Sequence, residues 1–292
     1  MRHAILITAY KDVESIVDLI ETMGSYFNYY IHFDRKSRIN FEKLADLPNV
    51  FITNELEVNW GGVNHFYVIL GLIEEALKNE DNDFFHLITG EDFPIKTTQY
   101  ILKLDRSKSF IKSSSFPFYN WDSSGGHDRY RRYHFYDFFN AKTKFGARLI
   151  YTLTLLQKIF QIKRKDFSVK KKFGGSTYWS LNREVLGYLL NQLDSNRLKK
   201  LRYTFCAEEF VFQTLLQDSP YKHTIVNDNL RFIDWTSKRG GDPAFLDETD
   251  FEKLKLSNAI FARKIRKIPN SPLLGLLKKH LKIESKISEY NT

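Results

Sequence analysis

An acidic pair, Glu208-Glu209, lies between aromatic residues and is the best candidate in this chain for acid–base chemistry. Apolar residues at 211, 212, 215 and 216 predict a helix that places both glutamates in its first turn. The helix dipole stabilises carboxylates there, so a purely structural role is one explanation. The other is a general base that removes a proton from a hydroxyl.

A second polar segment, Gly90-Glu91-Asp92-Phe93-Pro94-Ile95-Lys96-Thr97, directly follows the apolar run Asp83–Ile88. Such a run predicts a buried strand. Open α/β sheets bind ligands at the edge where the carboxyl ends of their strands lie. Taken by itself, however, the segment is better explained as an acidic turn after a core strand.

The elements that position these groups alternate along the chain. Apolar runs predict strands, and helical spacing of apolar residues predicts helices. The strands are His3–Thr8, Tyr29–Phe33, Asn49–Thr53 and Asp83–Ile88, and the helices run through Val13–Met23 and Phe66–Leu77. This order predicts an α/β fold with a single mixed, mostly parallel sheet flanked by helices.

Length and composition fit one large domain or two small ones. The net charge of +9 favours anionic partners, namely nucleotide diphosphates, nucleic acid or an acidic membrane face. The single cysteine, Cys206, excludes an internal disulfide and fits a reducing compartment. The chain shows neither a signal peptide nor an apolar run of about 20 residues, so we expect a cytoplasmic protein without a membrane span.

Two stretches, Ala141–Lys172 and Arg263–Lys282, mix basic residues with leucine and isoleucine, and the first ends in Lys170-Lys171-Lys172. Each stretch has two interpretations. One is a basic amphipathic helix that lies on an anionic membrane surface. The other is a helix that packs on the core and turns a basic face to solvent. The sequence does not distinguish them.

Together with Gly90–Thr97, the motifs Trp60-Gly61-Gly62 and Gly175-Ser176-Thr177-Tyr178-Trp179 resemble the core-2/I-branching glycosyltransferases, glycosyltransferase family 14, which include peptide xylosyltransferases. The resemblance implies a GT-A-type domain over residues 1–265, with 141–172 as a basic amphipathic insertion and 266–292 as a basic C-terminal tail or helix. It implies an inverting transfer from a UDP-sugar, similar to that of β-1,6-N-acetylglucosaminyltransferases, with N-acetylglucosamine or xylose as the sugar.

The resemblance also implies a catalytic residue. Family members place a general base at the second acidic residue of the acidic-acidic-aromatic motif, which is Glu209 here, with Glu208 as its neighbouring control. The family works without a metal. In this chain Asp81-Asn82-Asp83 precedes its strand rather than following it, so it is a poor metal-binding Asp-x-Asp motif. We therefore expect no metal and no other cofactor.

Basic residues late in the chain are implied to hold the diphosphate. The lysine that closes the family's phenylalanine-alanine-x-lysine motif corresponds to Lys264, which follows Arg263. A second basic residue, in the loop after the tryptophan motif, corresponds to Lys238 or Arg239. Arg239 is preferred because it directly precedes two glycines. Without the resemblance, Arg263 and Lys264 would be only a charge pair.

The remaining implied contacts concern the nucleoside and the acceptor. The family binds the uridine part with the segments that follow the first two strands, which selects Ala9, Phe33 and Asp34, whereas His32 is better explained as a core histidine. The acceptor candidates are Trp60, Asp92, Arg129, Ser176, Thr177, Tyr178 and Trp235. Where the family has a tyrosine two positions after the tryptophan, this chain has Ser237, which leaves the identity of the acceptor open.

The expected partners are a UDP-sugar and a glycan acceptor. Eukaryotic members of the family are typically anchored in the secretory pathway and disulfide-bonded. This chain departs from that pattern, so we expect a bacterial enzyme of surface polysaccharide synthesis. A lipid-linked acceptor on the inner face of the plasma membrane would explain the two basic stretches. A nucleic-acid partner is not expected, because no recognised motif surrounds the basic-aromatic loop at 125–133. The alternatives are a non-catalytic carbohydrate- or nucleotide-binding module and a basic nucleic-acid-binding protein.

Overall fold

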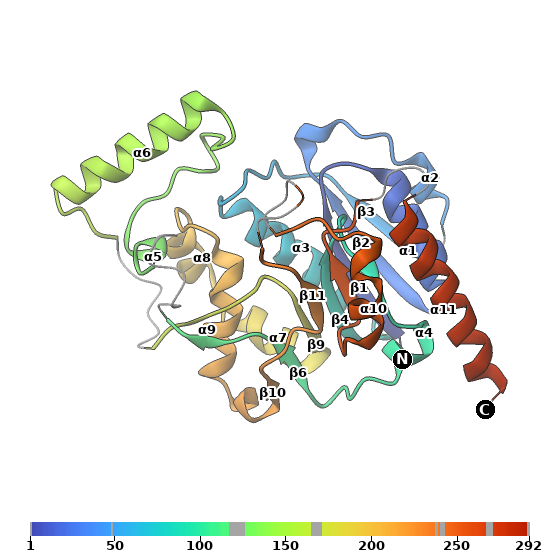
Figure 1. Ribbon diagram of the computed structural model, residues 1–292. Coiled ribbons are helices and arrows are strands. Elements are labelled where there is room, and N and C mark those ends of the chain that lie inside the picture. Colours follow the sequence, from blue (N-terminus) through green and yellow to red (C-terminus); the bar gives the residue numbers. More distant parts are fainter. Residues whose placement is uncertain are drawn as a thin grey trace.

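The computed structural model describes residues 2–47, 49–116, 126–164, 171–236, 239, 243–266 and 271–290. A seven-stranded sheet, in the order β10-β6-β9-β4-β1-β2-β3, forms the centre (Figure 1). Its strands are β1 (Arg2–Ala9), β2 (Phe27–Phe33), β3 (Val50–Thr53), β4 (Asn82–Thr89), β6 (Ser109–Ile111), β9 (Trp179–Asn182) and β10 (Ile225–Val226). Four pairings are parallel, and β9 runs antiparallel to β4 and β6. The predicted mixed, mostly parallel sheet is confirmed.

Helices cover both faces of this sheet (Figure 1). One apolar core lies under α3 (Asn64–Lys78), α7 (Arg183–Asn191) and α9 (Val211–Gln217). The other lies under α1 (Val13–Met23), α10 (Phe251–Leu256) and α11 (Pro272–Tyr290). Successive residues of β1 enter the two cores alternately. A strand buried on both faces must be apolar throughout, which is why the first strand was predictable.

In the described part of the chain, five further α-helices and two small sheets lie outside the central sheet and its two helical layers. The helices are α2 (Glu42–Ala45), α4 (Thr98–Leu102), α5 (Asp128–Arg131), α6 (Lys144–Ile159) and α8 (Ser195–Leu201). A three-stranded sheet joins β11 (Arg231–Ile233), β12 (Phe261–Arg263) and β5 (Phe93–Pro94), and β7 (Ser114–Ser115) pairs with β8 (Phe173–Gly174). Strands of two or three residues leave no periodic pattern, so the sequence did not predict these small sheets.

A buried arginine joins the three-stranded sheet to the central one. Arg231, at the start of β11, is 7% exposed and donates hydrogen bonds to the carbonyl oxygens of Leu87 in β4 and Trp179 in β9, both at 3.0 Å. It also donates to Ser180 Oγ at 3.1 Å. Burial lowers the pKa of Arg231 to about 9, and the charge of Asp92 opposes that shift. Arg231 therefore stays charged at neutral pH, with its hydrogen bonds offsetting the cost of burial.

The C-terminal basic stretch packs on the core. Leu273, Leu274, Leu277 and Leu281 of α11 are buried in the core that α1 also covers. On the outer side, Lys278 Nζ lies 2.5 Å from Asp18 Oδ1 of α1. Of the two interpretations of this stretch, the packing helix is the one observed. In the described portion of the chain, no helix is both long enough and apolar enough to cross a membrane.

Candidate active site

Glu209 lies in the 3-10 turn η2 (Ala207–Glu209), not in the first turn of α9 as the sequence predicts. Phe210, at φ −143°, separates the turn from the helix, so Glu209 is not at the helix N-terminus. The Glu209 side chain is 28% exposed and accessible to a reactant. Burial raises the pKa of Glu209, although the charge of Arg129 opposes this. A carboxylate with a raised pKa is better matched to proton transfer near neutral pH.

Arg129 of α5 holds the Glu209 carboxylate. Its Nη1 donates a hydrogen bond to Glu209 Oε2 at 2.6 Å, and its side chain is buried. The guanidinium carbon lies 5.0 Å from the centre of the Phe205 ring, which stacks against the cation. The sequence predicted Arg129 as an acceptor contact. In this structure it is the ion-pair partner of the candidate base.

Glu208, by contrast, points into the protein. His65 of α3 lies between Glu208 Oε1, at 3.0 Å from Nδ1, and Thr8 Oγ1, at 3.2 Å from Nε2. Because an ionised carboxylate only accepts hydrogen bonds, Nδ1–H donates to Glu208. Thr8 in β1 pairs with Thr89 in β4. Glu208 thus connects η2 to the carboxyl edge of the sheet, whereas Glu209 faces outward.

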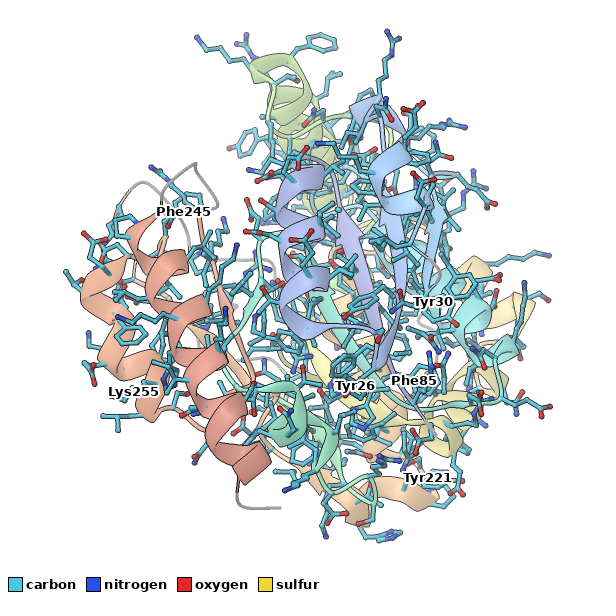
Figure 2. The ribbon with its side chains drawn as sticks, turned by 90° about the vertical axis from the view of Figure 1, so that its right-hand side faces the viewer. Tyr26, Tyr30, Phe85, Tyr221, Phe245 and Lys255 are labelled. Carbon is cyan, nitrogen blue, oxygen red and sulfur yellow. The ribbon has the colours of Figure 1, made fainter. Side chains whose placement is uncertain are left out.

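Arg263, at the end of β12, reaches the same edge from the other side. Its Nη1 donates to Thr89 Oγ1 at 3.1 Å, and Nη2 lies 3.6 Å from Glu91 Oε2. The guanidinium carbon lies 5.0 Å from the centre of the Tyr178 ring. Lys264 follows, with Nζ 5.5 Å from the ring of Phe245, which Figure 2 labels beside the C-terminal elements.

The pKa of Glu91 shows how positive this edge is. Burial by itself would raise that pKa, but a hydrogen bond from Lys11 and the charges of Lys11, Arg263 and Lys264 lower it. Lys11 Nζ lies 3.0 Å from Glu91 Oε1. Three cations therefore surround one carboxylate, and this positive edge is able to hold a further anion.

The segment Gly175–Tyr178 connects the candidate base to these cations. The backbone N–H of Gly175 donates to the carbonyl of Glu209 at 2.8 Å, and the ring of Tyr178 lies against Arg263. Position 175 must be glycine, since a Cβ there would lie 1.9 Å from the carbonyl oxygen of Lys112. The absence of a side chain at Gly175 therefore allows its backbone to approach the backbone of Lys112, which follows β6. The predicted acceptor residues Ser176 and Thr177 are half-buried between base and cations.

Two predicted acceptor residues, Trp60 and Trp235, are exposed aromatic side chains. Trp60 is 61% exposed and meets the Phe205 ring edge-on at 5.5 Å, beside Arg129. Trp235 is 67% exposed and follows β11, whose Ile233 pairs with Arg263 of β12. One tryptophan therefore lies near the base and the other follows the strand end beside the cations, where each can stack on a sugar ring.

The predicted nucleoside residues lie where β1 and β2 end. The backbone N–H of Asp34 donates to the carbonyl of Ala9 at 2.8 Å, which joins the two strand ends. Asp34 Oδ1 accepts a hydrogen bond from the backbone N–H of Val58 at 3.2 Å. Phe33 is buried and stacks on Phe41 with ring centres 5.8 Å apart. The side chains of Phe33 and Ala9 are therefore part of the core, and Asp34 follows them at the sheet edge.

Two other predicted residues make internal contacts. Asp92 is fully buried, and its Oδ2 accepts hydrogen bonds from the backbone N–H and the hydroxyl of Thr89. Arg239 Nε lies 2.6 Å from Asp247 Oδ2, and Nη1 lies 2.7 Å from Asp250 Oδ2. Arg239 thus already pairs with two carboxylates. Lys238 lies outside the described residues.

The sequence interpretation did not select His65, Lys11 or Glu91 as site residues. His65 lies three positions after the glycine pair and near the start of α3, so its only signal was a polar side chain at the beginning of an apolar helix. Lys11 lies just beyond β1, and Glu91 is part of the motif that follows β4. The Lys11–Glu91 ion pair and the contact of His65 with Thr8 depend on the strand pairing, which a sequence motif does not contain.

The site is defined by converging side chains rather than by an enclosed hollow. A hollow of about 390 Å³ lies elsewhere, between α1, α4 and α11, and none of the candidate residues lines it. Throughout the described ranges, no cluster of three or more His, Cys, Asp or Glu side chains is arranged to hold a metal ion.

Comparisons with known proteins identify related sequences. Residues 4–257 match the model of the Core-2/I-Branching enzyme family. The chain is 26% identical to Xylosyltransferase 1 of Mus musculus over 281 residues, covering 87% of this chain and 27% of that protein. It is also 26% identical to Xylosyltransferase oxt of Drosophila pseudoobscura pseudoobscura over 226 residues, covering 73% of this chain and 23% of that protein. The chain thus spans about a quarter of the length of these relatives.

Among solved structures, the chain is similar to the apo-form glycosyltransferase GlyE of Streptococcus pneumoniae TIGR4. The match covers 96% of this chain and 60% of that one, at 9% sequence identity and a TM-score of 0.38.

The Arg129–Glu209 contact generates a prediction about titration. Arg129→Met removes a charge that stabilises the ionised carboxylate, so the pKa of Glu209, already raised, should rise further. In the pH–rate profile of any reaction that needs ionised Glu209, the fall in rate at acid pH should then begin at a higher pH. Carbon-13 NMR titration of the side-chain carboxyl, assigned by its loss in Glu209→Gln, measures the pKa directly.

The matched control is Arg131→Met, which removes an exposed arginine from the same short helix. It should leave the Glu209 titration unchanged. An unchanged titration in a folded Arg129→Met protein would show that the ion pair does not control the carboxylate.

Proposed function

Because the chain belongs to the Core-2/I-branching enzyme family, we propose that it transfers a sugar from a UDP-sugar to a hydroxyl of a glycan acceptor, with inversion at the anomeric carbon. The observation that carries this proposal is the arrangement at one sheet edge. Glu209, whose partly exposed carboxylate has a raised pKa, lies at one end of Gly175–Tyr178, and Arg263, which precedes Lys264, lies at the other. Xylose is supported by the names of the similar proteins. N-acetylglucosamine remains the alternative that the sequence motifs suggest.

In the proposed reaction, Glu209 removes the proton of the acceptor hydroxyl as that oxygen attacks the anomeric carbon. The bond between that carbon and the diphosphate oxygen breaks, and UDP leaves with the bonding electrons. Arg263 and Lys264 meet the negative charge that develops on the diphosphate. The proton ends on Glu209, from which it returns to solvent. No metal ion takes part in this proposal.

The different environments of the two glutamates support Glu209 as the base. Glu208 is buried and holds His65 through a hydrogen bond of 3.0 Å. Glu209 has one oxygen on Arg129 and is exposed enough for an acceptor hydroxyl to approach. The arginine lowers the pKa of a carboxylate that burial alone would make more difficult to ionise. The pKa of Glu209 stays above its ordinary value, which favours uptake of a proton from an acceptor hydroxyl.

The proposed acceptor is a glycan that stacks on Trp60 near Glu209, in a β-1,6-type transfer during bacterial surface polysaccharide synthesis. The exposure of Trp60 and Trp235 supports a sugar-binding surface on both sides of the reaction centre. A lipid-linked glycan on the cytoplasmic face of the membrane is the proposed source of this acceptor.

The first test of the proposed function removes the base. Glu209→Gln keeps the shape of the side chain and removes its basicity, so transfer should fall by about 100-fold or more while UDP binding stays the same. Product formation, measured over a panel of UDP-sugars and glycan acceptors, together with UDP calorimetry separates the two effects. Glu208→Gln is the matched control at the adjacent position.

Near-normal transfer by Glu209→Gln, with loss of transfer in Glu208→Gln, would assign the general base to Glu208 instead. Wild-type protein that binds UDP and sugars but transfers nothing to any acceptor would instead indicate a binding module.

The second test concerns the diphosphate. Arg263→Met or Lys264→Met removes a charge proposed to contact a phosphate oxygen, so UDP affinity should fall by about tenfold or more. Lys279→Met, which changes an exposed lysine of α11, should bind UDP normally. Because side chains rather than a metal supply the countercharge, excess EDTA should alter neither UDP binding nor transfer. Loss of transfer in EDTA that manganese restores would contradict this part of the proposal.

A further inference from the structure

Helix α6 is attached to the rest of the protein by one side only. In Figure 1 it extends away from the central sheet, on the opposite side of the molecule from α11. Gly146, Ile150 and Gln157 form its buried side. Gln157 anchors it, since Oε1 accepts from the backbone N–H of Tyr133 at 2.7 Å and Nε2 donates to the Tyr133 carbonyl at 2.9 Å. The helix is therefore fixed in place, with its remaining surface uncovered.

The uncovered side of α6 is apolar. Phe145, Tyr151 and Ile159 are 73%, 68% and 62% exposed, and Leu155 and Leu156 are exposed as well. Viewed at 90° to Figure 1, side chains extend outward from the helix at the top of the molecule (Figure 2). A contiguous set of large apolar side chains in water is unfavourable, and such patches mark interaction surfaces. We call this side of α6, with Phe160 just beyond it, the α6 outer face.

The charges around the α6 outer face are all of one sign. Residues 141–164 contain six basic residues and no acidic one. Lys144, Arg148 and Lys158 are exposed on the helix, and Lys142 and Lys163 are exposed next to its ends. A helix that combines exposed leucine, isoleucine and phenylalanine with basic residues has the composition of helices that lie in a bilayer interface.

The second basic stretch does not share these features. Four of the five leucines of α11 are buried in the core, as described above, whereas Leu276 is 38% exposed. The lysine cluster after α6 also contributes less exposed positive charge than the sequence suggests. Lys172 is buried, and its Nζ lies 4.7 Å from the centre of the Tyr130 ring. Lys170 lies outside the described residues. The exposed large apolar groups of the two stretches are therefore concentrated on α6 and its C-terminal end.

We propose that the α6 outer face docks the protein on the surface of an anionic phospholipid bilayer. The apolar side chains enter the boundary between headgroups and acyl chains, and the basic residues contact the lipid phosphates. Charge complementarity selects this partner over a second copy of the chain, because two such faces would bring like charges together. The occupant is therefore a lipid surface.

The position of α6 connects docking to the proposed active site. Lys142, just before α6, has its Nζ 5.6 Å from the ring of Tyr10, whose hydroxyl donates to Glu91. Asp137, earlier in the same segment, accepts hydrogen bonds from the backbone N–H groups of Val63 and Asn64, at the start of α3. Docking through α6 thus holds the candidate site close to the bilayer, where a lipid-linked acceptor would lie. This last step rests on the proposed function, but the docking itself does not.

Vesicle flotation with the full-length protein tests the docking. Wild-type protein should float with vesicles of phosphatidylglycerol and phosphatidylcholine, should not float with phosphatidylcholine alone, and should detach as salt rises. Lys158→Glu and Ile159→Glu should each weaken partitioning by about fivefold or more. The matched controls are Lys279→Glu on α11 and Leu256→Glu at the end of α10, where Leu256 is 79% exposed.

Equal partitioning of the α6 variants and the controls would overturn the proposal, as would wild-type protein that ignores anionic vesicles at low salt. Sedimentation velocity without lipid gives a further check, because a wild-type dimer that Ile159→Glu dissociates would assign the face to a second copy. Each variant changes an exposed residue, so its melting temperature should match the wild type. The flotation assay contains no sugar donor or acceptor, so failure to bind vesicles would not count against the proposed transferase activity. Conversely, a protein that binds vesicles but transfers no sugar would still support the docking proposal.

Discussion

The candidate site depends on the buried guanidinium of Arg231. Placing a cation in a protein interior costs several kcal/mol, and hydrogen bonds from its donors offset part of that cost. Nη2 of Arg231 donates to carbonyl oxygens of β4 and β9, and Nη1 donates to Ser180 Oγ of β9, so the chain of β11 is held against the central sheet. Because β12 pairs with β11, the same contact places Arg263 beside Thr89 and Glu91. The electrostatics of the site therefore follow from a contact in the core.

A second constraint is the pairing of β1 with β4, which brings Thr8 opposite Thr89. Thr8 is connected to η2 by its hydrogen bond with His65, which in turn bonds Glu208, and the Thr89 hydroxyl accepts a hydrogen bond from Arg263. An acid–base group and a cationic group from distant parts of the chain thus share one sheet edge. Two adjacent glutamates acquire different roles there, since one is enclosed and the other is partly exposed.

Much of the fold was predictable, because the strands of a central sheet buried on both faces are long apolar runs, as in β1 and β4. The site was predictable only in part. Motifs selected Glu209, Arg263 and Lys264 as candidates, but they did not show the contacts of these residues. Arg129 was assigned to the acceptor because nothing local shows that it pairs with a residue 80 positions later. Arg239 was preferred for standing before glycines, yet a neighbouring acidic turn binds it. The two basic stretches have similar composition, and only packing separates α6 from α11.

The central claim is that Glu209 and the Arg263–Lys264 pair serve one site at the carboxyl edge of the sheet. The most direct measurement is a crystal structure of the protein with UDP. We expect the diphosphate oxygens within hydrogen-bond distance of Arg263 or Lys264, the uracil near Ala9 and Asp34, and the Glu209 carboxylate open on the side where the sugar would leave. UDP bound away from this edge, or a diphosphate held only by other residues, would contradict the account.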